Sequence, residues 1–209
     1  MTLVNRKLIK LNNRGVRNVS TFGSVSGGSM TFIKKLTASS SGDLSFVNGS
    51  SDVVLDSTYK EYIFTLNNIH PSANDESLSV NFRDGGSAYD ATKTTTAARA
   101  YHNEAGTTQA VAYVAGSDLV QSTAVQDISF NLGSDADQCC AGTLHLFNPS
   151  STTFVKHFII RTNTTHASDY TNEWFIAGYC NVTAAIDGVQ FKMSSGNIDA
   201  GDICLYGIK

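Results

Sequence analysis

The sequence predicts an all-β protein whose strands pair antiparallel in a sandwich or a barrel. Three observations lead to that fold class. Short apolar segments with strand character recur along the chain, the breaks between them combine Gly, Ser, Asn and Asp as turns do, and no amphipathic helix of about ten residues or more stands out. The 209 residues are 41% hydrophobic and 16% charged, which excludes wholesale disorder and suffices for a full core.

Alternation of apolar and polar residues justifies the individual strands. It is clearest at 188–193, where Val189, Phe191 and Met193 point to one side and the residues between them to the other. Segment 91–100 has room for a short helical turn, although its run of threonines argues against a longer helix. In chain order, the predicted strands are 31–36, 44–47, 53–55, 59–69, 78–83, 97–102, 110–114, 127–132, 143–147, 154–161, 174–182, 188–193 and 203–208.

The strand predicted over 154–161 has apolar residues on both faces. Phe158 lies on one face, with Lys156 as a polar exception, and Ile159 lies on the other, so we expect cover on both sides. The preceding Asn-Pro-Ser-Ser at 148–151 favours a turn, because proline presets its φ. This strand and the one before the turn are therefore predicted to form a central hairpin.

The first 29 residues are predicted to be an N-terminal anchoring arm and linker, and residues 30–209 a single domain. Residues 1–42 carry seven basic side chains and no acidic one, whereas residues 43–209 carry the other 8 basic and all 18 acidic side chains, a formal charge of −10. This asymmetry indicates docking of the arm on an acidic protein surface, with docking on its own body or a neighbouring copy as the alternative. The candidate docking residues are Arg6, Lys7, Lys10, Arg14 and Arg17.

Nucleic acid and membrane are not expected partners. The basic stretch lacks interleaved aromatic residues, and the acidic body would repel phosphate. No apolar run approaches the roughly 18 residues that span a bilayer, and the N-terminus lacks the continuous apolar stretch of a secretory signal.

The four cysteines predict free thiols. Cys139 and Cys140 are adjacent, which is not the CxxC spacing of a metal site, and the others form no local pair. Cys180 and Cys204 lie in alternating apolar segments, where a thiol packs as a small hydrophobic group. Buried free thiols are therefore expected, with at least one disulfide as the alternative.

Sequence patterns of known catalytic sites are missing. There is no GxSxG, phosphate-loop or dinucleotide-binding glycine motif, and the histidines stand singly. His166 near Asp169 resembles an acid–base pair but has no identifiable nucleophile. Asp135 and Asp137 in a polar loop are weak candidates for a hard cation, and a solvated loop is the alternative. The sequence therefore predicts no enzyme, no cofactor and no metal site beyond that weak candidate.

Aromatic residues near predicted loops suggest a second kind of surface. Exposed aromatic rings with Asn or Asp neighbours can stack on sugar rings, whereas core packing or contact between subunits is the alternative explanation. The candidate glycan contacts are Tyr89, Tyr101, Tyr113, Tyr170 and Trp174.

Three stretches carry a resemblance to a known family. They are LSFVNGSSDVVLDSTYKEY at 44–62 with NIHP at 68–71, LHLFNPSSTTFVKHF at 144–158, and IDGVQFKMSSGNIDAGDICLYGIK at 186–209. Together they resemble small virion structural proteins of marine tailed bacteriophages of the cyanophage and pelagiphage kind, over about residues 16–209. The closing GDICLYG is the most specific and resembles the last hairpin of many phage jelly-roll modules.

The resemblance implies an antiparallel jelly-roll-like β-sandwich with an extended basic N-terminal arm. It implies a non-enzymatic virion protein on the particle exterior, assembled in the host bacterial cytoplasm: a capsid decoration or cement protein, or alternatively a tail-fibre or receptor-binding module with a carbohydrate-binding surface. The expected partners are major capsid or tail proteins and, in the alternative, a host surface glycan. A homotrimer is also expected, because apolar and aromatic residues are plentiful and a closed trimer would cover edge strands; the alternative is a monomer held only by its binding site on the capsid.

Overall fold

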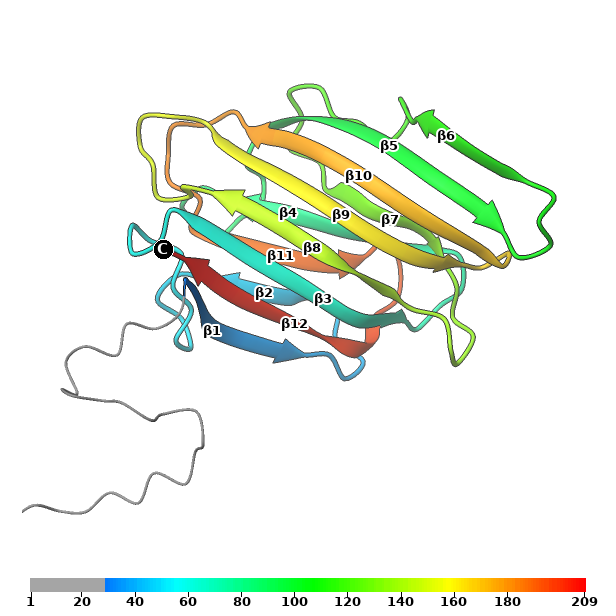
Figure 1. Cartoon of the computed structure of the whole chain (residues 1–209). Helices are drawn as coiled ribbons and strands as arrows, with labels where there is room; N and C mark the ends of the chain where they lie inside the picture. The colour runs from blue at the N-terminus through cyan, green and yellow to red at the C-terminus, as the bar shows by residue number, and fades with distance from the viewer. Residues whose placement is uncertain (1–28) are drawn as a thin grey trace, which may run out of the picture.

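The computed structural model describes residues 29–209, which form twelve β-strands and no helix (Figure 1). Every pair of neighbouring strands is antiparallel. The all-β, antiparallel fold expected from the sequence is therefore confirmed. Two predicted strands coincide with β2 (Leu44–Val47) and β11 (Gly188–Met193), where turn residues bound a short alternating segment on both sides.

The strands lie in two layers that meet along β9 (Figure 1). Strand pairing joins the layers at Leu132 and His166, and further hydrogen bonds cross there, such as the one from the Gly133 N–H to the Thr165 carbonyl at 3.1 Å. The first layer has the order β1 (Met30–Thr37), β12 (Ile198–Ile208), β3 (Glu61–Pro71), β8 (Cys140–Phe147), β9 (Lys156–His166), β10 (Tyr170–Cys180), β5 (Lys93–Asn103) and β6 (Gln109–Tyr113). The second layer has the order β7 (Gln126–Leu132), β4 (Glu76–Arg83), β11 and β2.

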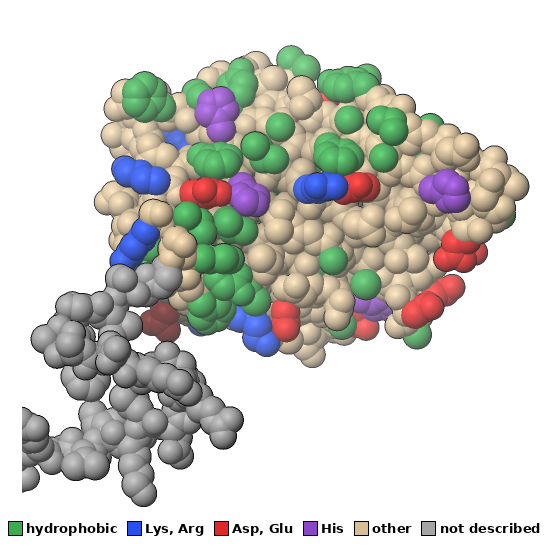
Figure 2. Space-filling view, in the orientation of Figure 1, with side chains coloured by type: hydrophobic (Ala, Val, Ile, Leu, Met, Phe, Trp, Pro, Cys, Tyr) green, Lys and Arg blue, Asp and Glu red, His purple; other side chains and the backbone are tan. Residues whose placement is uncertain are grey.

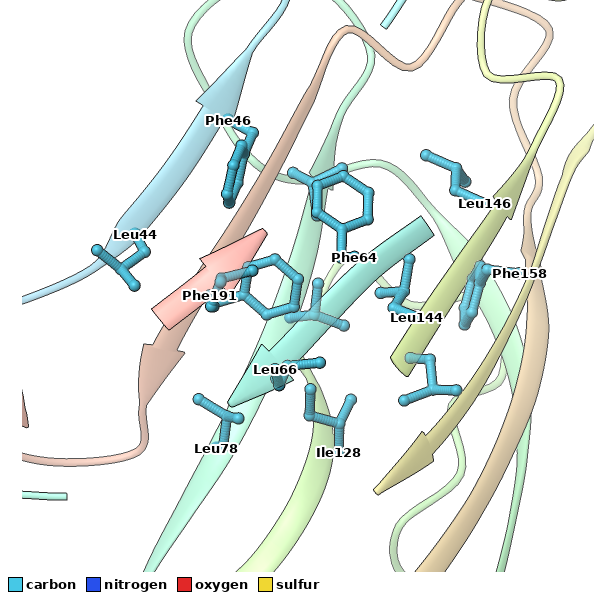
Figure 3. Packing of buried hydrophobic residues seen from close by; sticks show 14 of the residues in the cluster. Leu44, Phe46, Phe64, Leu66, Leu78, Ile128, Leu144, Leu146, Phe158 and Phe191 are labelled. Carbon is cyan, nitrogen blue, oxygen red and sulfur yellow. The ribbon is translucent and has the colours of Figure 1, made fainter. Parts of the chain in front are cut away.

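A cluster of apolar side chains fills the space between the layers (Figure 3). Phe64 of β3 in the first layer contacts Phe46 of β2 and Phe191 of β11 in the second. The Phe46 and Phe64 rings meet edge to face, with centroids 5.2 Å apart, and the Phe64 and Phe191 centroids are 5.7 Å apart. All three side chains are fully buried. The inward face predicted for 188–193 is therefore confirmed, and aromatic pairs bind the layers together.

In the strand predicted at 154–161, the structure confirms the common face of Lys156 and Phe158 but not the expected cover on both sides. Lys156 is buried, and its ammonium donates hydrogen bonds to the backbone oxygens of Ser151, Phe154 and Val182 at 2.8–3.3 Å. Those three carbonyls replace water, so the lysine stays inside although burial lowers its pKa. The outer face is not covered within residues 29–209, because the Ile159 side chain is 52% exposed.

Two other segments differ from prediction. Residues 53–55 form no strand, because Ser51 and Asp52 just before them have φ values of 50° and 67°, which a strand excludes. Val53 and Leu55 are nevertheless buried, so the apolar pattern there marked core and not a strand. The short helical turn considered for 91–100 is replaced by β5, in which the threonines are extended.

All four cysteines are free, as expected. Cys140 and Cys180 are buried, and burial raises the pKa of their thiols to about 11 and about 12. Cys139 and Cys204 are only half-buried, so the expectation of burial is wrong for these two. Cys204 follows the alternation of β12, where the buried side chains are those of its neighbours Ile203 and Leu205.

Candidate ligand-binding site

A cavity of about 300 Å³ lies at the end of the molecule where β9 and β10 are joined by a turn. Two of its walls are neighbouring strands, β5 and β10, which pair along their whole length. The turn between β9 and β10 and the turn between β5 and β6 supply the rest. The lining residues are Arg99, Tyr101, Thr108, His166, Ser168, Tyr170 and Asn172.

The cavity exists because the cover over the inner face of β5 ends part-way along the strand. Side chains alternate between the two faces of a strand. On the inner face Lys93, Thr95 and Ala97 are buried, whereas Arg99 and Tyr101, which come next in the same alternation, are only half-buried. The second half of β5 thus presents an inward face that nothing in residues 29–209 fills completely.

The Arg99 guanidinium lies over two aromatic rings. Its central carbon lies 4.7 Å from the centroid of the Tyr101 ring and 5.6 Å from that of the Trp174 ring. Trp174 is buried and stacks in turn on Phe130 of β7, with centroids 4.2 Å apart. A cation over an aromatic face is attracted by the ring quadrupole. The stack therefore holds the guanidinium at the cavity and limits the rotation of its side chain.

Unpartnered polar atoms gather at this cavity. Among residues 29–209, the buried side-chain nitrogen and oxygen atoms that lack a hydrogen-bond partner are Arg99 Nε, Asn172 Oδ1 and Trp174 Nε1. Arg99 and Asn172 line the cavity, and Trp174 touches Arg99 from below. Leaving a buried polar group unpaired costs about 1–3 kcal/mol, so native proteins seldom tolerate it without a reason. A polar ligand is such a reason.

The turn between β9 and β10 positions His166. The backbone N–H of Ser168 donates to His166 Nδ1 at 3.0 Å, which leaves the proton of the neutral ring on Nε2. Asp169, with φ 59°, completes the tight turn, and its carbonyl accepts a hydrogen bond from the Glu104 N–H at 3.0 Å. Burial lowers the pKa of His166; Asp75 acts against that shift, and Arg99 adds to it. The ring is therefore a neutral donor at pH 7.

The structure brings together three of the five predicted aromatic contacts. Tyr101 and Tyr170 line the cavity with their rings edge to face, centroids 5.9 Å apart, and Trp174 supports Arg99 beneath them. Tyr113 lies on the edge strand β6, where its hydroxyl donates to Asp118. Tyr89 lies beyond the end of β4, close to Gly188.

Sequence reasoning missed the polar members of the site. Arg99 stands in a strand of small residues, and the alternation from Ala97 to Tyr101 was the signal that it points inward with its neighbours. Asn172 stands two residues before Trp174 and shares its face for the same reason. Only the pairing of β5 with β10, which sets Tyr101 opposite Asn172, places these side chains in one site.

The remaining predicted sites are not part of this cavity. Asp135 and Asp137 are exposed in the loop between β7 and β8, and residues 29–209 contain no group of three His, Cys, Asp or Glu side chains that could hold a metal ion. The same residues include no helix long and apolar enough to cross a membrane. The predicted docking residues lie outside the described part of the chain, and their role stays a prediction: Arg6, Lys7, Lys10, Arg14 and Arg17.

Comparison of the chain with protein-family models, with curated proteins and with solved structures finds no match.

Proposed function

We propose that this protein is a non-enzymatic structural protein on the exterior of a tailed-bacteriophage virion, with a jelly-roll body. The strand order supports this proposal most directly. Four strands of the first layer run β1-β12-β3-β8, and the second layer runs β2-β11-β4-β7. Two four-stranded sheets connected in this order follow the jelly-roll pattern, which viral capsid and lectin domains use. The four other strands extend the first layer as two insertions, β5–β6 and β9–β10.

The outer face of the first layer supports attachment to other virion proteins or to copies of the same chain. Figure 2 shows hydrophobic side chains spread over this face. Phe32, Ile159 and Phe175 are 57%, 52% and 40% exposed there. Ile159 of β9 and Phe175 of β10 lie on neighbouring strands, and neighbouring exposed apolar groups mark protein contacts. Contact with the major capsid protein or with tail proteins would cover these apolar side chains. Contact between the subunits of a homotrimer would also cover them.

Location and assembly state are tested on the particle and on the purified chain. The proposal expects density for this chain on the outside of the virion, arranged around threefold axes. Light scattering of the full chain should give about 67 kDa, three times the 22.3 kDa chain. Absence of the chain from purified virions would contradict the structural role. A mass of 22.3 kDa in solution together with isolated copies on the particle would contradict the trimer.

A second candidate function, a receptor-binding module that binds a glycan, is favoured by the cavity. Its two tyrosine rings supply stacking surfaces, and its hydroxyl, amide, imidazole and guanidinium groups supply hydrogen bonds. A few convergent polar groups on aromatic walls are typical of small-ligand sites.

This second function is tested by glycan-array binding of the full chain. Tyr101→Ala should abolish binding, because it removes both a lining side chain and one of the two rings that the Arg99 guanidinium contacts. Tyr113→Ala is the matched control, because that tyrosine is 58% exposed on β6 and does not line the cavity. Equal loss in both variants, or no bound glycan at all, would contradict the glycan-binding function.

A further inference from the structure

We propose that the cavity binds a carboxylate-bearing sugar ring, with the Arg99 guanidinium as the group that holds the carboxylate. This inference rests on the glycan-binding function above and deepens it, because it names the class of sugar. Three features carry it: the charge of the cavity, the state of Arg99, and the arrangement of the other donors.

The cavity lining carries one positive charge, that of Arg99. His166 is neutral at pH 7, and none of the seven lining residues is acidic. This is unusual for the body of this chain, because residues 43–209 carry a formal charge of −10. A neutral sugar requires no positive charge in its site, whereas an anionic sugar is attracted to one. The acidic surface around the cavity would repel an anionic sugar from the rest of the molecule.

Arg99 differs from the two other arginines in residues 29–209. Arg83 forms a two-pronged pair with Asp187, at 2.8 and 3.0 Å, and Arg161 pairs with Glu173 at 2.5 Å. Arg99 forms no ion pair with any residue that the structure describes, and its Nε has no hydrogen-bond partner. Burying a guanidinium nitrogen without a partner is costly, and a carboxylate removes that cost with a planar two-point contact.

The aromatic stack prepares Arg99 for this contact. Because Tyr101 and Trp174 lie within 4.7 and 5.6 Å of its central carbon, the guanidinium is held before a ligand arrives. A ligand therefore binds without first ordering a long side chain, which otherwise reduces affinity. Lysine has no planar fork and stacks less well, so it would be a poor substitute at this position.

The other lining groups suit the rest of a pyranose ring. The Tyr101 and Tyr170 rings provide faces for its C–H groups, and His166 Nε2 provides a neutral donor. Asn172, which is 1% exposed, brings an unpartnered acceptor for a sugar hydroxyl to the cavity wall. A cavity of about 300 Å³ holds one sugar ring but not an extended chain, so recognition would be of a terminal or protruding residue.

The test is titration calorimetry of the full chain with five methyl glycosides: glucuronate, galacturonate, N-acetylneuraminate, glucose and galactose 6-sulfate. We expect at least one of the three carboxylated sugars to bind about tenfold or more tightly than glucose, and the strongest of the three identifies the source. Arg99→Met should remove that preference, and Arg99→Lys should restore only part of it. Arg161→Met is the matched control, because that arginine lies on the outer face, over the Phe175 ring.

The outcomes separate this inference from the function on which it rests. If glucose binds as tightly as all three carboxylated sugars, the acidic class is wrong while glycan binding stands. If the sulfated sugar binds most tightly, the carboxylate assignment is wrong. If no sugar binds, both are wrong. Should Arg99→Met fail to fold, the wild-type preference among the five sugars still decides, and Asn172→Val provides a second variant in the same cavity.

Discussion

The enclosed core and the cavity are both formed by the inward side chains of alternating strands. The two regions differ in how the polar groups at these inward positions are paired. Between the layers, most inward side chains are apolar and buried, and the buried polar ones among them are paired, as Thr95 is with Gln126 at 2.6 Å. At the cavity, inward positions of β5 and β10 are Arg99, Tyr101, Asn172 and Trp174, and three of their polar atoms lack partners. The two regions therefore differ in whether inward polar atoms have partners: within residues 29–209 they do where the two layers meet, and three of them do not where the cover ends.

β5 passes through both regions and carries a cation in each. Lys93 at its start is buried and donates to the Ala91 carbonyl at 3.1 Å. Arg99, six residues later, is half-buried and lies over two aromatic rings. One cation is enclosed and solvated by the backbone, whereas the other is held at an opening. We expect the enclosed region to matter for stability and the cavity to matter for ligand binding.

The largest expected effect is in the core. Phe191→Ala removes a fully buried ring that contacts Phe46 and Phe64, so it should lower the free energy of unfolding by about 3–5 kcal/mol in urea denaturation. Phe154→Ala is the control, because that ring is 70% exposed and its loss should be nearly neutral. A loss below about 1 kcal/mol for Phe191→Ala would show that the two layers do not depend on this cluster.

The next effect concerns Lys93, whose pKa burial lowers from 10.5 to about 8. The folded state therefore releases a proton that the unfolded chain still holds between pH 8 and about 10.5, so stability should rise as the pH rises through that window. The shift corresponds to about 3 kcal/mol. Lys93→Met should flatten the rise and raise stability at pH 7. If the free energy of unfolding of the variant rises with pH as steeply as that of the wild type, another group is responsible for the pH dependence.

Asp127 on β7 should give a smaller effect of the opposite sign. Burial raises the pKa of its carboxyl from 3.8 to about 6. The folded state holds a proton there that the unfolded chain has lost, so stability should fall as the pH rises from about 4 through 6. Because the side chain is half-buried, we expect about 1–2 kcal/mol. Denaturation curves of Asp127→Asn should lack this fall, and a variant that keeps it would refute the assignment.

The smallest effect on stability is expected at the cavity. Asn172→Val removes a buried acceptor that has no partner, so it should raise the free energy of unfolding by about 1 kcal/mol and at the same time weaken sugar binding. Thr171→Val, on the outer face of the same strand, should change neither quantity. If Asn172→Val destabilises the protein and leaves binding intact, the asparagine is a structural residue and the contrast between the two regions fails.

The short strands show how far local pattern reaches. The segments at 44–47 and 188–193 were predictable because alternation and bounding turn residues agree. The alternation put Lys156 on the inward face as a polar exception, but its burial was not predictable, because the three carbonyls that hold it come from a loop before it and a segment after β10. Residues 53–55 were mistaken for a strand because apolar alternation reports burial and not backbone conformation.

The cavity shows the same division. Three of its aromatic residues were candidates from the sequence, because tyrosine and tryptophan near loops offer flat surfaces. Only strand pairing showed that these three residues lie at the cavity while Tyr89 and Tyr113 do not. β5 and β10 are far apart in the chain, and the register of their pairing sets Tyr101 opposite Asn172. Arg99 could not be recognised from the sequence, because the fold decides whether an acidic side chain lies close enough to pair with it.

The amino-acid sequence by itself determined the fold class, the approximate positions of most strands and the inward face of β11, because alternation and turn chemistry act between near neighbours in the chain. The tertiary structure alone decided the order of the strands, the fold-over at β9 and the point along β5 where the cover ends. That point places Arg99 and Asn172 in the wall of a cavity, with the buried Trp174 ring next to Arg99. The physical reason is that burial and partnering of a polar atom depend on what lies opposite it, and that is set by contacts between residues distant in the sequence.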